Sequence, residues 1–208
     1  MARPGRPHDD LGQNGTVNIE TVTDPTEAAE VAAVAAVTFP LACPPHSKPE
    51  NITAHIAAHL SEAKFACYIA DDTHEVLVAR DDEGGVVGYA LLVHANPADP
   101  DVIKAIRAAE CGRDALESKN VTEVSKMYVL PDHHASRGQA RPSHALMEAS
   151  LDTARTRGAH YVWLGVNSEN ERAQKYYRKM GFAQIGTKTF NMNGVVEHDH
   201  VMGRLIRP

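Results

Sequence analysis

The chain has 208 residues, a length that predicts a single domain with short extensions. Hydrophobic residues make up 43 % and charged residues 23 % of it, which excludes a wholly disordered protein. The net charge is −6 and no basic stripe is visible, so we expect no nucleic-acid partner. The three cysteines are scattered, and no apolar stretch approaches the ~18 residues of a membrane span. We therefore expect a reduced, cytoplasmic protein without a membrane partner.

The N-terminal residues differ in character from the rest of the chain. Residues 1–15 are polar and rich in Pro and Gly, and they predict a disordered tail. A single domain is expected over residues 16–208, because no repeat, low-complexity block or linker divides them. The domain begins with a strand at 16–22, where apolar and polar residues alternate.

Two capping patterns predict the first helices. Asp24 is followed by proline and, three residues on, by Glu27, which makes a capping box at the start of an Ala- and Val-rich helix. We expect this helix to end near Thr38, because the prolines of residues 39–46 break it. Residues 47–50, Ser-Lys-Pro-Glu, form a second capping box ahead of a second amphipathic helix.

Strands and helices then alternate to the end of the chain. Two apolar runs, 76–80 and 86–93, flank a loop with glycine and predict a β-hairpin. The later elements expected from the residue pattern are a helix at 99–111, a strand at 121–129, a helix at 143–157, a strand at 161–166, a helix at 170–180 ended by Gly181, and strands at 183–190 and 196–205. This order predicts a mixed α/β fold.

Residues 123–182 carry the candidate chemistry. A loop at 131–142 leads from a strand into a helix N-terminus, where main-chain N–H groups without helical partners can form an anion site. Further on, Asn170, Ala173 and Tyr177 lie at i, i+3 and i+7, so they share one face of a helix. The small residue on that face leaves room for a ligand, and the phenol beside it is a usable proton donor.

This segment resembles the GCN5-related N-acetyltransferases (GNAT). The matching pieces are the strand Glu123–Val129 followed by Pro131, a loop similar to the Arg/Gln-x-x-Gly-x-Gly/Ala pyrophosphate motif, the helix residues Ala145-Leu146-Met147, and Asn-x-x-Ala-x-x-Tyr-Tyr-x-Lys-x-Gly-Phe at Asn170–Phe182. The order of elements matches from Thr16 to about Leu205. The block Trp163–Asn167 and the C-terminal strands look most like the bacterial spermidine/spermine N-acetyltransferase branch.

The resemblance implies both a fold and an activity. The fold is a central twisted, mostly antiparallel sheet flanked by helices, with a parallel pair of strands that splays apart at the cofactor site. The activity is transfer of an acetyl group from acetyl-CoA, without a metal, to a primary amine of a small, polyamine-like acceptor. The amine would attack directly in a ternary complex. By analogy with this fold, the last strands can form a homodimer.

The resemblance also assigns roles to individual residues. Main-chain groups of Met127, Tyr128 and Val129 would pair with the pantetheine arm, and a strand N–H would polarise the thioester oxygen. The remaining cofactor positions are Arg137, Gly138, Gln139, Ala140, Arg141 and Ser143 at the pyrophosphate, with Asn167, Asn170 and Ala173 at the pantetheine. Tyr177 would protonate the departing thiolate. Glu123 would deprotonate the substrate ammonium, directly or through a water.

Plainer interpretations stand beside these roles. Glu123 can be a rim residue, Tyr177 a packing residue, and Asn167 and Asn170 caps of a turn and a helix. The loop also departs from the family pattern, because Ala140 replaces a glycine and Pro142 has no N–H, although Gly138-Gln139-Ala140 offers another register. A non-catalytic acyl-CoA sensor therefore stays open as an alternative, as does a protein N-terminal or lysine acetyltransferase.

The acceptor side has three candidates, Phe39, Cys43 and His198. Phe39 and Cys43 lie where the family places acceptor-side walls, and Cys43 is interpreted first as a small buried residue. His198, together with Asp199, can line the acceptor pocket. His198 and His200 share a strand face, but spacing fixes no third or fourth ligand, so we expect no metal site.

Overall fold

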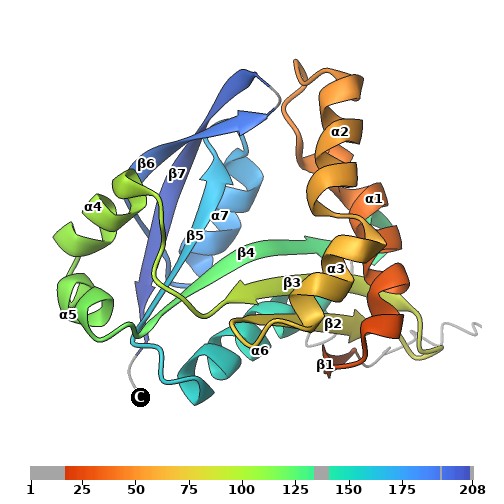
Figure 1. Ribbon diagram of the computed structural model, residues 1–208, viewed down its shortest axis with the longest axis horizontal. Coiled ribbons are helices and arrows are strands. Elements are labelled where there is room, and N and C mark those ends of the chain that lie inside the picture. Colours follow the sequence, from red (N-terminus) through yellow and green to blue (C-terminus); the bar gives the residue numbers. More distant parts are fainter. Residues whose placement is uncertain (1–16, 134–140, 193, 207–208) are drawn as a thin grey trace, which may run out of the picture.

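The computed structural model describes residues 17–133, 141–192 and 194–206. In this part of the chain one sheet has the strand order β1-β2-β3-β4-β5-β7-β6 (Figure 1). The strands are β1 Asn18–Val22, β2 His74–Arg80, β3 Val86–Val93, β4 Val121–Val129, β5 Tyr161–Asn167, β6 Ala183–Met192 and β7 Val195–Leu205. Every neighbouring pair is antiparallel except β4 and β5, which are parallel. The expected mixed α/β sheet is confirmed.

The parallel pair separates partway along its length. Pairing between β4 and β5 covers Val121–Glu123 against Tyr161–Trp163, although both strands continue beyond these residues. Figure 1 shows the two strands diverging from that point, so that the sheet opens into a V. The splayed pair expected from the resemblance is therefore present, and it leaves an opening in the middle of the sheet.

Helices cover both faces of the sheet. They are α1 Ala28–Ala42, α2 Pro49–His59, α3 Glu62–Ile69, α4 Pro100–Ala108, α5 Gly112–Glu117, α6 Pro142–Thr156 and α7 Glu171–Lys179, with short 3₁₀ turns at Pro25–Glu27 and Pro131–His133. Helices α6 and α7 share one core cluster on the back of the sheet. Two separate clusters lie on the front, one under α1 and α3 and one under α4 and α5. No helix in the described ranges is long and apolar enough to cross a membrane.

The first helices differ from their predicted limits. Asp24 caps the first turn as expected and accepts a hydrogen bond from the Thr26 N–H at 2.9 Å. Helix α1, however, continues past Thr38 through Pro40 to Ala42. Proline costs one hydrogen bond inside a helix, but a single lost bond within the last turn does not outweigh the burial of the helix face. The predicted capping box at Ser47 is not formed, because Lys48 occupies the N-cap position of α2 without a side-chain cap bond and Pro49 begins the helix.

Two short helices are absent from the predicted elements. Helix α3 has only eight residues and one fully buried side chain, Phe65, so its apolar periodicity is weak. The predicted helix at 99–111 ends at Ala108, and the chain then turns into α5. Cys111 takes a left-handed conformation at this turn, with φ 56°. Gly112 follows because a Cβ there would clash with the Ile106 carbonyl.

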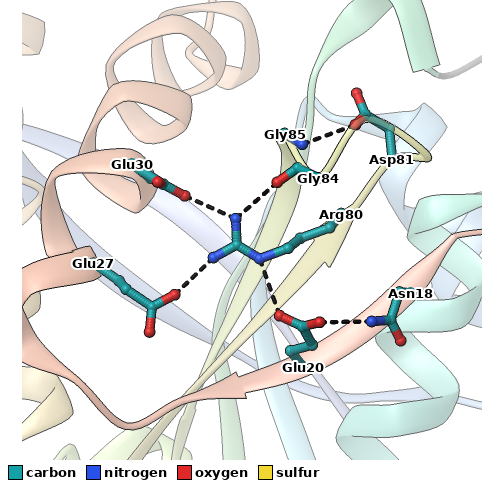
Figure 2. A network of polar contacts seen from close by, with 8 residues as sticks. All are labelled: Asn18, Glu20, Glu27, Glu30, Arg80, Asp81, Gly84 and Gly85. Carbon is teal, nitrogen blue, oxygen red and sulfur yellow. Dashed lines mark hydrogen bonds and ion pairs between the residues drawn. The ribbon is translucent and has the colours of Figure 1, made fainter.

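One arginine joins the N-terminal elements to the β2–β3 hairpin. The Arg80 guanidinium donates to Glu20 at 3.0 Å, to Glu30 at 2.8 Å and to Glu27 at 2.7 Å (Figure 2). It also donates to the Gly84 carbonyl at 2.9 Å. These bonds raise the Arg80 pKa, with the bond to Glu30 contributing most. Strand β1, the start of α1 and the β2–β3 hairpin are held together by this one side chain.

Candidate active site

Two cavities meet at the opening between β4 and β5. The first, of about 400 Å³, lies on the front of the sheet between α1, α2 and the strands β4, β5, β6 and β7. The second, of about 270 Å³, reaches the first turn of α6 and the start of α7. Residues that line both cavities are Ala42, Met127, Tyr128, Asn170, Ala173 and Tyr177. We refer to the first as the front cavity and to the second as the helix cavity.

A β-bulge in β4 determines which side chains face the front cavity. Leu91 pairs with Lys126 and Leu92 with Val124, so Ser125 is an extra residue without a partner on β3. In a regular strand, residues 123 and 126 would point to opposite faces. The bulge resets the alternation, and both Glu123 and Lys126 line the front cavity.

Burial shifts the pKa values of this carboxyl and this ammonium in opposite directions. Desolvation raises the Glu123 pKa, while the charges of Lys126 and Lys188 partly oppose the rise. Desolvation lowers the Lys126 pKa, and the charge of Glu123 partly opposes that change. Lys126 Nζ lies 3.4 Å from Ser125 Oγ and 5.6 Å from the centre of the Tyr68 ring. The pair is thus a desolvated acid and base beside one another.

Strands β6 and β7 add a second ion pair to the cavity wall. Lys188 Nζ lies 3.3 Å from Asp199 Oδ2, and both side chains are less than one-fifth exposed. A Cβ on Gly165 of β5 would be 2.8 Å from Lys188 Cε, so glycine gives the lysine room to cross that strand. This ion pair therefore depends on three strands.

Glu197, two residues before Asp199 on the same face of β7, is buried and pairs with a histidine. Its Oε1 lies 3.1 Å from His46 Nε2, in the loop between α1 and α2. Cys43 is nearby and lines the same cavity. Burial, aided by the charge of Glu197, raises the Cys43 pKa to about 11, so the thiol stays protonated. This agrees with a packing role for Cys43.

An aromatic wall closes the acceptor side of the front cavity. The Phe39 ring stacks on His55 with centroids 4.5 Å apart, and its edge approaches Tyr128 at 6.4 Å. Burial lowers the His55 pKa to about 4, with the charges of His59 and Lys126 acting in the same direction. His55 is therefore neutral at pH 7, and the wall is apolar in character.

The helix face predicted from spacing is present at the junction of the two cavities. Ala173 and Tyr177 line both cavities, and burial raises the Tyr177 pKa to about 12. Asn170 caps α7 by accepting from the Ala173 N–H at 3.0 Å, and Asn167 accepts from the Glu169 N–H at 2.8 Å. Both bonds use Oδ1 and leave the Nδ2 donors unengaged by them. The capping roles are confirmed, and both residues also line the front cavity.

The start of α6 borders the helix cavity. Arg141 is the N-cap, Pro142 takes the first helical position, and Ser143 lines the cavity. Proline suits this position because the first N–H of a helix has no helical acceptor. The Tyr176 hydroxyl donates to the Ser143 carbonyl at 2.7 Å, which fixes α7 against α6. The predicted loop residues Arg137, Gly138, Gln139 and Ala140 lie outside the described residues.

Most of the residues singled out from the sequence meet at this site. Glu123, Met127, Tyr128, Tyr177, Asn167, Asn170, Ala173, Phe39 and Cys43 line the front cavity, and Val129 and Ser143 line the helix cavity. His198 is different, because strand alternation turns it away from Glu197 and Asp199, and it is exposed. Among the described residues, no group of three or more His, Cys, Asp or Glu side chains could hold a metal ion.

Sequence reasoning missed four charged or ionisable residues of the site, His46, Lys126, Lys188 and Glu197. Glu197 had a usable signal, because it shares the parity of Asp199 along β7. Lys126 did not, since its placement depends on the bulge at Ser125. His46 and Lys188 are brought in by loop position and strand pairing across the sheet.

Comparison with known families identifies the chain. Residues 39–182 match the model of the acetyltransferase (GNAT) family. The chain belongs to this family. It is an acetyltransferase of the GNAT type. The matched residues include β4, α6, β5 and α7, but not β6 and β7. Among curated relatives, an uncharacterized N-acetyltransferase of Mycobacterium tuberculosis (strain ATCC 25618 / H37Rv) is 43% identical over 179 residues. The alignment covers 86% of this chain and 97% of the relative.

Solved structures share the fold at low sequence identity. The PaiA N-acetyltransferase of Thermoplasma acidophilum, in complex with coenzyme A, has a TM-score of 0.66 and 15% identity, over 92% of this chain and 99% of that one. YncA of Salmonella typhimurium, with acetyl-CoA, has a TM-score of 0.58 and 17% identity, over 93% and 95%. The spermidine/spermine N-acetyltransferase SpeG of Vibrio cholerae, with manganese ions, has a TM-score of 0.56 and 17% identity, over 91% and 92%. These likenesses show the fold, and the branch of the family stays a prediction.

Proposed function

We propose that this acetyltransferase moves the acetyl group of acetyl-CoA to a primary amine of a small acceptor by direct attack in a ternary complex. The observation that carries the proposal is the meeting of two cavities at the opening between β4 and β5. One cavity reaches a helix N-terminus, and the other is lined by ionisable groups. Two substrates can therefore approach each other through the sheet.

The helix cavity has the features that coenzyme A requires. Ala173 is small and leaves space beside Met127 and Tyr128, where a slender pantetheine arm fits. The first turn of α6, at Ser143, and Arg172 also line this cavity, and a helix N-terminus and a guanidinium suit a pyrophosphate. Two solved neighbours contain coenzyme A or acetyl-CoA, which agrees with this assignment.

The main-chain N–H of Met127 can donate a hydrogen bond to the thioester oxygen. Leu130 donates its N–H to Val87 on β3, so alternation along the antiparallel ladder turns the Met127 N–H away from β3. That direction is the opening toward β5. An N–H held there can stabilise the negative charge that develops on the thioester oxygen during attack.

Glu123 is the proposed general base. An amine attacks as the free base, so its ammonium must first lose a proton. Glu123 lines the front cavity, and burial raises its pKa, which makes the carboxylate a better proton acceptor. The C–N bond then forms and the C–S bond breaks. The first proton of the ammonium is on Glu123 or on an intervening water, and the second proton, which nitrogen loses as the amide forms, passes to the leaving sulfur through Tyr177 or solvent.

Tyr177 is the proposed donor to the leaving sulfur. Its pKa of about 12 keeps the phenol protonated at pH 7. A thiol has a pKa of about 8.5, so complete proton transfer from the phenol is uphill by about 5 kcal/mol. A hydrogen bond to the developing thiolate avoids that cost, and the sulfur can take its proton from Tyr177 or from solvent as the product leaves.

The charges of the front cavity bear on the acceptor. Three carboxylates, Glu123, Glu197 and Asp199, support a cationic amine. Lys126 and Lys188 lie among them, and Lys188 already neutralises Asp199. A polycation would place further positive charge against these lysines, so the cavity supports a monoamine better than a polyamine.

The test has two stages. In the first, acetyl-CoA is added to the full chain and thermal unfolding is followed. A ligand present at 100 times its Kd stabilises the folded state by about 2.7 kcal/mol, so binding should raise the unfolding temperature. In the second, thiol release is measured with a panel of amines. Binding with turnover supports the proposal. Absence of both contradicts it, and binding without turnover favours the acyl-CoA sensor considered for the altered phosphate loop.

A further inference from the structure

Among the described residues, one acid and one base of the front cavity make no ion pair with a neighbouring side chain. Asp199 pairs with Lys188 at 3.3 Å, and Glu197 lies 3.1 Å from His46. Glu123 and Lys126 remain. Among the described residues, neither takes part in an ion pair within 4.0 Å. They are therefore available to a bound molecule.

These two groups lie on the same face of the sheet for a local reason. The bulge at Ser125 turns Glu123 and Lys126 to one side of β4, in agreement with their pairing with Val93 and Leu91, which share a face of β3. A bulge gives up ladder pairing at one residue. Here it sets a carboxylate and an ammonium next to each other in a cavity of about 400 Å³.

Desolvation makes an unpaired Lys126 costly once the cavity is filled. An amine without an anionic group would exclude water and leave the lysine without an ion-pair partner, and the acceptor's ammonium would compete with it for Glu123. A polyamine would add repulsion. A carboxylate on the acceptor would instead pair with Lys126, while the acceptor's own ammonium faces Glu123.

We infer that the acceptor is an amino acid, a small amine that carries a carboxylate near its reacting nitrogen, and that Lys126 binds this carboxylate. The inference rests on the proposed function, since it names the acceptor of the same site. The aromatic wall of Phe39, His55 and Tyr128 then faces the remainder of the amino acid. Lys126 is thereby a specificity-determining residue, and Glu123 keeps its role as base.

The experiment compares matched acceptors. Each α-amino acid in a panel is assayed beside its decarboxylated amine and its methyl ester, with a short peptide and spermidine as further arms. We expect kcat/KM at least tenfold higher for amino acids than for the matched amines. Lys126→Met should lower kcat/KM at least tenfold for the amino acids and less than threefold for the amines, and Lys126→Arg should restore part of the loss.

Two controls separate the possible explanations. Lys175→Met removes an exposed lysine of α7 that pairs with Glu171 outside both cavities. It should leave kcat/KM unchanged for every acceptor. Acetyl-CoA binding by Lys126→Met shows that the variant is folded. If Lys126 only adjusted the charge of Glu123, its loss would slow both members of each pair equally, which would overturn the inference.

The other outcomes are also decisive. Turnover of amines, peptide or spermidine as fast as of amino acids overturns the inference while leaving the acetyltransferase proposal intact. If the unmodified chain neither binds acetyl-CoA nor releases thiol, the proposed function itself is contradicted. A preference for the amino acid that disappears in Lys126→Met supports both.

Discussion

The hydroxyl of Tyr176 donates a 2.7 Å hydrogen bond to the carbonyl of Ser143, 33 residues earlier in the chain. It joins the second turn of α7 to the first turn of α6, and both residues line the helix cavity. The neighbouring Tyr177 lines both cavities instead. We therefore propose separate tasks for two adjacent tyrosines of one helix, one that joins α7 to α6 and one that contacts the leaving sulfur where the two cavities meet.

Tyr176→Phe tests the first task. Loss of one hydrogen bond should lower the free energy of unfolding by about 1 kcal/mol, measured by urea denaturation. We expect the KM for acetyl-CoA to rise a fewfold, because the first turn of α6 is held less firmly, with little change in kcat. A drop in kcat of tenfold or more would mean that Tyr176 acts in the chemistry.

Tyr177→Phe tests the second. The phenol is proposed to stabilise the leaving sulfur, so kcat should fall about 100-fold while acetyl-CoA affinity stays within a fewfold of the original. Tyr176→Phe serves as the matched control for loss of a hydroxyl at the adjacent position. Full activity of Tyr177→Phe would remove this residue from the mechanism.

Glu123→Gln tests the base through the pH profile. Burial raises the Glu123 pKa, so the carboxylate forms, and kcat/KM rises, as the pH increases through that raised value. In Glu123→Gln this rising limb should vanish and kcat/KM at pH 7 should fall about 100-fold. Glu171→Gln, on the exposed start of α7, is the control. An unchanged limb in Glu123→Gln would assign it to the acceptor amine alone.

Cys43 offers a test of burial that needs no substrate. Its pKa of about 11 leaves roughly one thiol in a thousand ionised at pH 8. Iodoacetamide should therefore label the exposed Cys67 and Cys111 well before Cys43, as followed by mass spectrometry of the peptides. Labelling of Cys43 first would show that the thiol is open to solvent and ionised.

Arg80→Met tests the network that joins the N-terminal segments to the sheet. Without the guanidinium, three glutamates face one another at the same place (Figure 2). We expect a loss of about 1 to 3 kcal/mol in the free energy of unfolding, partly recovered at high salt because salt screens the repulsion. Arg80→Lys should lose less, since it keeps the charge but not the fork of donors. Equal stability of all three proteins would contradict a structural role.

The sequence predicted the elements whose signals are local. The limits of β4 match the observed strand, and the face of α7 that holds Ala173 and Tyr177 follows from helical spacing alone. The predicted end of α1 was wrong, because the helix continues through Pro40 to Ala42, and a proline in the last turn removes only one main-chain hydrogen bond. Helix α5 was missed because its start depends on a left-handed residue at Cys111 and on a tight contact at Gly112, which no local residue pattern indicates.

The site residues that lie in one short segment could be predicted from the sequence. The site residues that pairing between strands brings together could not. Tyr177 and Asn170 come from one motif. Lys188 reaches the cavity only because β6 pairs with β7 and because Gly165 leaves room on β5. Lys126 faces inward only through the irregularity at Ser125. Pairing register and bulges are properties of the assembled sheet, so a residue pattern read along one strand does not contain them.

The bulge at Ser125 also has a consequence for how substrate preference can change over time. Insertion or loss of one residue in β4 would exchange the inward and outward sets of side chains beyond it. A single such event would replace Lys126 at the cavity by its neighbour and alter the charge seen by the acceptor, and it would also turn Val129 away from the core cluster that β4 shares with α6. Changes of charge at the cavity are therefore coupled to changes in the core, and a library of deletions at residues 124–126 assayed for both acceptor preference and stability would measure that coupling.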